Sequence, residues 1–214
     1  MNKIKAIIFL ILSLALSAKG QHARTFSNYG LLYSPSKTGN TYQVAMGEAI
    51  QFSKLPALRL IAGLNFQLKN YTAVPWNHKD IKNAKLFALN EKTKVSKLNF
   101  PVGLELAFKG VGIGVSQEIF NFGFKKTIDS TMADIEPNTE FKHLRFSSLL
   151  SKESNNSVSS NLYVHFTINE SFTFLFGILK QKSIFNIYKN SKKTDYIGLG
   201  ETHPYFSIRF NIEK

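Results

Sequence analysis

Apolar and polar residues alternate with a period of two along several long stretches of this chain. From Leu98 to Phe108 every even position is apolar, whereas the odd positions carry asparagine, proline, glycine, glutamate and alanine. A period of two places successive side chains on opposite faces of a β-strand, and a helix would need a period near 3.6. The pattern therefore predicts strands, the clearest of them at 94–108.

This clearest strand is the first arm of a predicted hairpin. Lys109 and Gly110 form a tight reversal, and a second arm at 111–124 is rich in glycine, valine, isoleucine and phenylalanine. Such a short connection between two apolar runs is typical of a β-hairpin. Both arms exceed the length of about five or six residues of an ordinary strand. Both are long enough to supply the about nine to eleven residues that cross a bilayer at a tilt.

Two of the predicted strands interrupt the alternation. In 41–52, Glu48 shares its face with apolar residues, so the strand either bulges or carries Glu48 on its apolar face. In 111–124, the phenylalanines at the end lie on the opposite parity from the valines and isoleucine at the start. An extra residue in one strand reverses the parity beyond it. We therefore predict a β-bulge at 116–119.

The same alternation predicts eight strands, at 25–33, 41–52, 57–71, 94–108, 111–124, 158–168, 171–181 and 203–212. Short connections at 53–56, 109–110 and 169–170 alternate strictly with longer ones at 34–40, 72–93, 125–157 and 182–202. A strand-like piece lies inside the third of these longer connections, at 141–150. Outer-membrane barrels sort their connections by length in this way, and closure leaves no unpaired strand edge in lipid. The predicted fold is all-β, a single eight-stranded antiparallel up-and-down transmembrane barrel.

The N-terminus has the pattern of a secretory signal peptide. Two lysines precede an apolar run at 6–16, and small residues at Ala18 and Gly20 mark a cleavage site before Gln21. The run is too short for a membrane-spanning helix of about twenty residues. We therefore expect a signal peptide at 1–20 and an exported barrel domain at 21–214, located in the cell outer membrane.

Composition narrows the class of protein and of partner. The chain has no cysteine, which excludes a disulfide-stapled scaffold. It carries 27 Lys and Arg against 14 Asp and Glu; without the three lysines at 3, 5 and 19 the net charge is 24 − 14 = +10. An exported protein rarely meets nucleic acid, so we expect outer-membrane lipid and lipopolysaccharide as partners. The alternative is a basicity that only reflects the host's proteome.

Charged residues occupy the faces opposite the apolar ones. They are Arg59, Lys69, Lys97, Glu105, His165 and Arg209, joined by Glu118 if its strand stays in register. An eight-stranded barrel has an interior about wide enough for side chains to fill it, and buried charges must pair. We therefore expect a structural salt-bridge network in the lumen, formed by Arg59, Glu105, Glu118 and Arg209. No residue spacing indicates a cofactor or metal site, and in this interpretation we expect no catalytic residues.

The hairpin resembles a known family in its motifs. The strand Lys94–Phe108, the Lys109-Gly110 turn, the glycine-rich return and the closing aromatic strand are similar to the PorT-like family, small outer-membrane β-barrel proteins of Bacteroidetes. The resemblance implies an integral outer-membrane, porin-like protein without an assigned activity, and some relatives assist a secretion apparatus. We expect a monomer with a structural or interaction role, and an envelope protein as a further candidate partner.

Two other functions remain open at this point. His165 and Thr167 lie two apart on one strand face near Glu170, which are the residue types for acyl hydrolysis. The pair resembles the His and Ser of outer-membrane lipid A deacylases, and an enzyme of that class is the first alternative. The second is a soluble exported barrel with its apolar faces turned inward around a small apolar ligand.

Overall fold

The computed structural model describes residues 23–53, 55–75, 86–124, 127–129, 139–143, 146–148, 158–169 and 171–213. Eight long strands stand in it: β1 (Ala23–Ser34), β2 (Gly39–Phe52), β3 (Leu55–Pro75), β4 (Leu86–Phe108), β5 (Val111–Gly123), β9 (Ser159–Ile168), β10 (Phe172–Lys189) and β11 (Lys192–Glu213). Three short strands accompany them: β6 (Thr127–Asp129), β7 (Thr139–His143) and β8 (Phe146–Ser148). Within these ranges no helix is long and apolar enough to cross a membrane.

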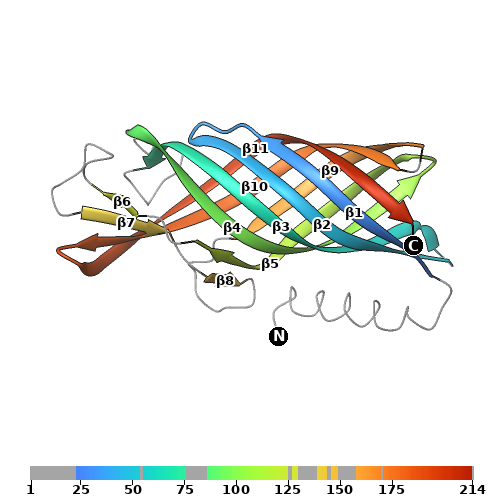
Figure 1. Ribbon diagram of the computed structural model, residues 1–214, viewed down its shortest axis with the longest axis horizontal. Coiled ribbons are helices and arrows are strands. Elements are labelled where there is room, and N and C mark those ends of the chain that lie inside the picture. The colour runs from blue at the N-terminus through green and yellow to red at the C-terminus, as the bar shows by residue number, and fades with distance from the viewer. Residues whose placement is uncertain are drawn as a thin grey trace.

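The eight long strands close into one barrel (Figure 1). Each pairs antiparallel with its neighbour in the order β1, β2, β3, β4, β5, β9, β10, β11, and β11 pairs with β1 to complete the ring. The predicted eight-stranded antiparallel up-and-down barrel is confirmed. Closure satisfies backbone hydrogen bonds along both edges of every barrel strand without leaving a long free edge.

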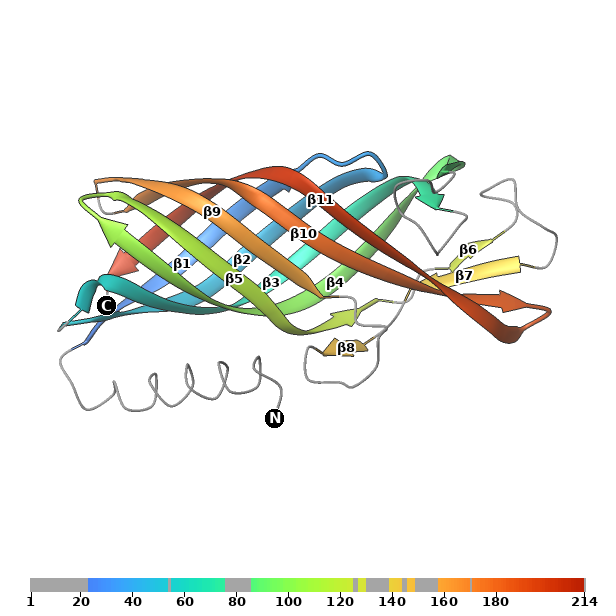
Figure 2. The same ribbon diagram turned by 180° about the vertical axis from the view of Figure 1, so that it is seen from behind.

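The two ends of the barrel differ. The β2–β3, β4–β5 and β9–β10 turns lie at one end, together with the start of β1 and the end of β11 (Figure 2). We call this the turn end. At the other end β10 and β11 run on together as a long hairpin, and β7 pairs with β10 there. We call this the hairpin end.

The predicted long connections are partly wrong at the hairpin end. Most of 182–202 is strand, because β10 continues to Lys189 and β11 begins at Lys192. The connection predicted at 72–93 likewise contains the end of β3 and the start of β4, and residues 76–85 lie outside the described residues. These extensions mix lysines and other polar residues with apolar ones without a regular period of two. Backbone hydrogen bonds to neighbouring strands hold these extensions in the sheet. Their residue types do not alternate, so the sequence pattern does not predict them as strands. Within 125–157, β7 and β8 overlap the predicted strand-like piece at 141–150.

The predicted bulge in the central hairpin is confirmed. Phe100 pairs with Phe120 and Pro101 with Glu118, so Ile119 of β5 has no residue opposite it on β4. Beyond Ile119 the parity reverses, and the rings of Phe100 and Phe120 stack on the outer face with centroids 4.3 Å apart. In β2 the register around Glu48 is regular, and this residue lies exposed on the outer face.

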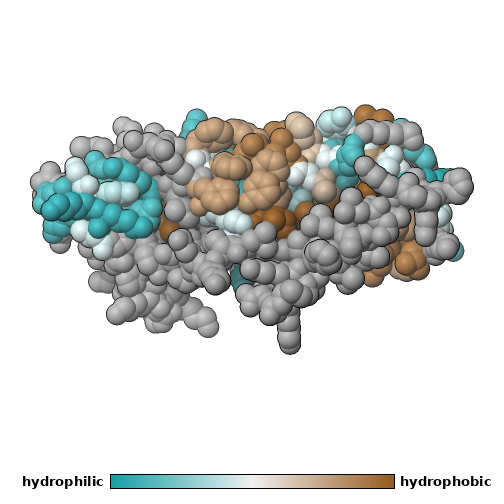
Figure 3. Space-filling view, turned by 90° about the horizontal axis from the view of Figure 1, so that it is seen from below, coloured by the Kyte–Doolittle hydropathy of each residue, from teal (hydrophilic) through white to brown (hydrophobic). Residues whose placement is uncertain are grey.

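Burial is inverted relative to a water-soluble domain. Among the described residues, 20 polar or charged residues are buried against 11 hydrophobic ones, so the interior is more polar than apolar. The large hydrophobic side chains stand instead on the outer face of the barrel. On the face shown in Figure 3, apolar residues gather over the middle of the molecule and hydrophilic ones over the hairpin end.

Adjacent residues of β9 show the inversion at a single strand. Leu162 is 55% exposed and Val164 is 43% exposed, whereas His165 is 1% exposed. The apolar face therefore turns outward. The alternative of a soluble barrel with apolar faces around a ligand is wrong, because it requires the reverse orientation of each strand.

Candidate functional site

The lumen of the barrel is where charged side chains from distant parts of the sequence meet. Parity places them there: each inward position is two residues from the next along its strand, and neighbouring strands supply partners in register. Three ionic clusters follow one another from the turn end to the hairpin end.

The cluster nearest the turn end is built around Glu105 of β4. Its Oε1 accepts hydrogen bonds from Nη1 of Arg209 on β11 at 2.6 Å and from the hydroxyl of Tyr163 on β9 at 2.8 Å. Its Oε2 lies 3.9 Å from Nε2 of His165. The side chain of Glu105 is 1% exposed and that of Arg209 is 13% exposed. Charge-assisted bonds of this length in a dry interior are the strong class of hydrogen bond.

Two glycines make room for this cluster. Gly112 and Gly114 of β5 face the lumen, and a Cβ on them would overlap the ring of His165 and the ring of Tyr163 respectively. The rings of His165 and Tyr163 on β9 therefore lie close to the bare backbone of these two glycines. The row of glycines in this strand is therefore not a phosphate-binding loop. It makes room for large side chains in a narrow barrel.

The middle cluster joins β4, β5 and β9. Nζ of Lys97 donates to Oε2 of Glu118 at 3.1 Å and to Oγ of Ser159 at 3.2 Å. Glu118 also accepts from the backbone N–H of Ser159 at 3.2 Å and from the amide of Asn121. Both charged side chains are at most 5% exposed. The bulge at Ile119 allows Glu118 and Asn121, three residues apart, to face the lumen together.

The third cluster lies toward the hairpin end. Glu201 of β11 accepts hydrogen bonds from the ammonium of Lys69 on β3 and from Oγ1 of Thr38, the latter at 2.5 Å. Beside it, Oγ of Ser34 contacts Nδ1 of His203 and donates to the carbonyl of Pro204 at 2.5 Å. This cluster ties the β1–β2 connection to β11.

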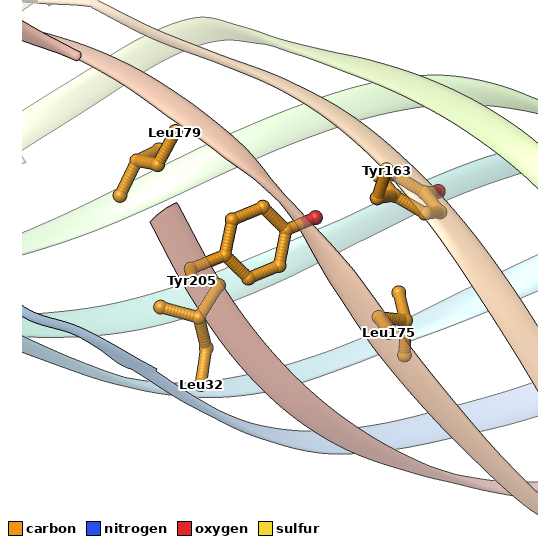
Figure 4. Close-up of a cluster of buried hydrophobic side chains, with 5 residues drawn as sticks. All are labelled: Leu32, Tyr163, Leu175, Leu179 and Tyr205. Carbon is orange, nitrogen blue, oxygen red and sulfur yellow. The ribbon is translucent and has the colours of Figure 1, made fainter. Parts of the chain in front are cut away.

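Side chains fill most of the space between the clusters. Leu32, Tyr163, Leu175, Leu179 and Tyr205 form an apolar patch on the lumen wall made by β1, β9, β10 and β11 (Figure 4). A cavity of about 100 Å³ lies against Leu32, Tyr163, Leu175 and Tyr205, and glycines of β1 to β4 also line it. Pro101, Gly103 and Ser116 border it, so it lies between the Glu105 and Glu118 clusters. A cavity of this size holds a few waters.

The four residues predicted to form one network are divided in the structure. Glu105 and Arg209 belong to one cluster, Glu118 belongs to another, and Arg59 lies opposite Glu105. Glu105 and Arg209 contact each other directly, whereas Glu118 takes Lys97 as its partner. Arg59 lies opposite Glu105 in the β3–β4 pairing, and its guanidinium stands 5.3 Å from the ring centroid of Phe26.

Sequence reasoning missed two of the ion pairs. The inward parity of Lys97 and Lys69 was visible, but parity alone does not say which carboxylate each would meet. Glu201 lies in 182–202, a segment that the sequence predicts as a loop, so the period of two assigns it to neither face of a strand. Its pairing with Lys69 could be found only once β11 was known to extend through it.

The residues of the hydrolase alternative do not form a catalytic pair. Oγ1 of Thr167 lies 3.0 Å from Oγ1 of Thr173, and both ring nitrogens of His165 lack a hydrogen-bond partner among the described residues. A nucleophile and its base need hydrogen-bond contact, whereas Nε2 of His165 lies 3.9 Å from Oε2 of Glu105. In the part of the chain that the structure describes, no three His, Asp or Glu side chains are placed to hold a metal ion.

Comparison with known proteins gives similarity in structure only. No family model matches the chain, and no characterised relative matches its sequence. Among solved structures it is similar to the N-terminal β-barrel domain of Pseudomonas aeruginosa OprF, at 10% identity over 90% of this chain and 98% of that one, with a TM-score of 0.44. A major outer membrane protein from Thermus thermophilus shares 8% identity over 90% and 100% of the two chains, with a TM-score of 0.42. Neisserial surface protein A shares 6% over 89% and 97%, with a TM-score of 0.38.

Proposed function

We propose that this chain is an integral outer-membrane protein whose closed barrel has a structural or interaction role. One observation carries the proposal: the large apolar side chains lie on the outside of the ring and the ionic ones on the inside. In water this arrangement exposes far more apolar surface than a monomer tolerates. In lipid it is the arrangement of a transmembrane barrel, because the outer face meets hydrocarbon and the lumen stays polar.

The height of the apolar face supports the same location. On β4 the outward residues run apolar from Leu98 to Phe108, ten residue steps. Ten steps of about 3.4 Å at a tilt of about 40° rise about 26 Å, against about 25 Å for the apolar band of outer-membrane barrels. Tyr33 and Tyr42 contact each other near the hairpin end, at 5.3 Å between ring centroids, where an interfacial aromatic belt would lie.

The contents of the lumen support a role other than transport. Three ionic clusters and the tyrosine-leucine patch occupy it, and the cavity between them is small. An open pore would need a wider ring of strands. With the hydrolase pair apart, we favour a non-enzymatic protein, and the long hairpin end offers the surface for an envelope partner. Membership in the PorT-like family remains a prediction.

Single-cysteine labelling tests the membrane location cleanly because the chain has no cysteine of its own. Val164→Cys lies on the outer apolar face, and Thr194→Cys lies exposed at the hairpin end as the matched control. In isolated outer membranes we expect a water-soluble maleimide to modify Thr194→Cys and to leave Val164→Cys unmodified until the membrane is dissolved. Equal modification of both in intact membranes, or recovery of the protein only in the soluble periplasm, would contradict the proposal.

A planar-bilayer recording tests the closed lumen separately. The purified barrel should insert without a steady ohmic current above that of the lipid alone. A stable open level in most insertions would show a continuous aqueous path and would favour a channel.

A further inference from the structure

One row of outward side chains crosses four neighbouring strands of the barrel. Backbone pairing aligns Gln117 of β5 with Ser160 of β9. Ser160 in turn lies opposite Lys180 of β10, and Lys180 lies opposite Thr202 of β11. All four side chains are polar and share the outer face, and we call them the polar row. Lys180 is its only charged member and is exposed.

The rows next to it toward the turn end are entirely apolar. The first consists of Val115, Leu162, Ile178 and Pro204. The second consists of Ile113, Val164, Phe176 and Phe206. The rings of Phe176 and Phe206 contact each other at 5.2 Å between centroids. A single step along the strands thus separates an exposed ammonium flanked by hydroxyls from a smooth hydrocarbon surface.

We infer that the polar row binds the phosphate group of a membrane lipid. Lys180 supplies the cation, and the acyl chains of the lipid lie on the apolar rows. This inference rests on the proposed function. The ammonium of Lys180 supplies the charge, and the exposed hydroxyl of Thr202 beside it can donate to a second phosphate oxygen. The hydroxyl of Ser160 donates to Oε1 of Gln117 at 2.6 Å, which fixes the far side of the row.

Two carboxylates of the described residues in this part of the sheet have partners of their own. Glu201 is next to Thr202 in sequence but points into the lumen, where Lys69 and Thr38 bind it. Glu140 of β7 pairs with Lys142 at 2.7 Å. Among the described residues no carboxylate is paired with Lys180, so its charge is available to an anion from outside the protein.

The apolar rows favour a lipid over free phosphate. A small anion would use only Lys180 and its hydroxyl neighbours, which form an open, solvated surface of low affinity. A lipid adds contact along Ile178, Phe176 and Phe206, in the direction in which its chains would extend. Charge and hydrophobic surface then act on one molecule.

Native mass spectrometry of the purified barrel in detergent provides the test. The probes are phosphatidic acid, diacylglycerol with the same chains, and inorganic phosphate. The test variant is Lys180→Gln. The control variant is Lys193→Gln, which loses the same single positive charge at an exposed position at the tip of the hairpin end. We expect Lys180→Gln to weaken phosphatidic acid binding about fivefold, the equivalent of about 1 kcal/mol per lysine near a membrane surface. Lys193→Gln should leave binding unchanged, and diacylglycerol should bind wild type and Lys180→Gln alike.

The three probes distinguish a failure of this inference from a failure of the proposed membrane location. Equal binding of phosphatidic acid to wild type and Lys180→Gln, with both lipids retained, overturns this inference alone. Displacement of phosphatidic acid by millimolar inorganic phosphate shows a free-anion site and also overturns it. Failure of the wild-type barrel to retain either lipid counts against the membrane location itself.

Discussion

Breaking the contact between Glu105 and Arg209 should destabilise the barrel strongly and asymmetrically. The two groups are 2.6 Å apart, so at an effective dielectric constant of about 20 they attract by about 6 kcal/mol. Much of that attraction offsets the cost of removing both charges from water. Losing one partner leaves the other charge buried alone, which costs about 3–5 kcal/mol.

The asymmetry follows from burial. Arg209→Gln leaves the carboxylate of Glu105, which is 1% exposed, without a counter-ion, so we place it at the upper end of that range. Glu105→Gln leaves an arginine that is 13% exposed, and its new amide oxygen can still accept from Tyr163. The double variant Glu105→Gln/Arg209→Gln removes both charges, and it should be more stable than Arg209→Gln alone.

Urea unfolding of the barrel refolded in lipid vesicles measures these differences, with the folded fraction read from heat-modifiable gel mobility. The surface pair Arg24–Glu213, at 3.8 Å and with side chains 73% and 50% exposed, is the control. Glu213→Gln should cost at most about 1 kcal/mol. The reasoning would be refuted if the stability losses of the two single variants simply added in the double variant. It would also be refuted if Arg209→Gln lost as little stability as Glu213→Gln. Because Arg59 lies opposite Glu105, Arg59→Gln in the Arg209→Gln background tests whether a second arginine takes over.

Three further substitutions test the other features of the barrel. Gly114→Leu should cost about 1–3 kcal/mol in the same assay, because the new side chain would overlap the ring of Tyr163. Val164→Arg should cost about 2–4 kcal/mol in vesicles, since it places a guanidinium in the apolar band. Lys97→Met should cost about 3–5 kcal/mol, because it leaves Glu118 buried without its ammonium partner.

Each of these has a matched control or a contradicting result. Thr194→Arg places the same guanidinium at the exposed hairpin end and should change stability by less than about 0.5 kcal/mol. If Val164→Arg is equally mild, the outer face does not meet hydrocarbon. A combined Lys97→Met/Glu118→Leu variant should recover stability relative to Lys97→Met alone, and no recovery would argue against the ion pair as the cause. A Gly114→Leu barrel as stable as wild type would show that Tyr163 can move aside.

The sequence predicted the ring of strands because alternation and connection length are local signals. The same parity rule located the bulge at 116–119, since only an extra residue reconciles Val115 with Phe120 on one face. It failed where strands leave the apolar band. Along Lys182–Lys189 the outer face carries no hydrophobic pattern, so pairing with β11 and β7 could not be read from residue type.

Partner choice in the lumen was the other limit. Parity shows that Lys97, Glu105 and Arg209 face inward, but which of them touch depends on the stagger of strands far apart in sequence. Arg209 reaches Glu105 across the lumen from β11 to β4, strands that are not hydrogen-bonded neighbours. No periodicity in a single chain encodes such a distance.

Inverted burial also changes which residues hold the fold. In a membrane the outer side chains meet hydrocarbon whether or not neighbouring strands pair around them, so their apolar surface adds little to the preference for the closed barrel. What distinguishes the closed state is the complete set of backbone hydrogen bonds and the pairing of buried charges. An exchange such as Leu162→Ile on the outer face should therefore be nearly silent, whereas a conservative exchange such as Glu105→Gln in the lumen should not. In a water-soluble domain, where the apolar residues form the core, the order of these effects would be reversed.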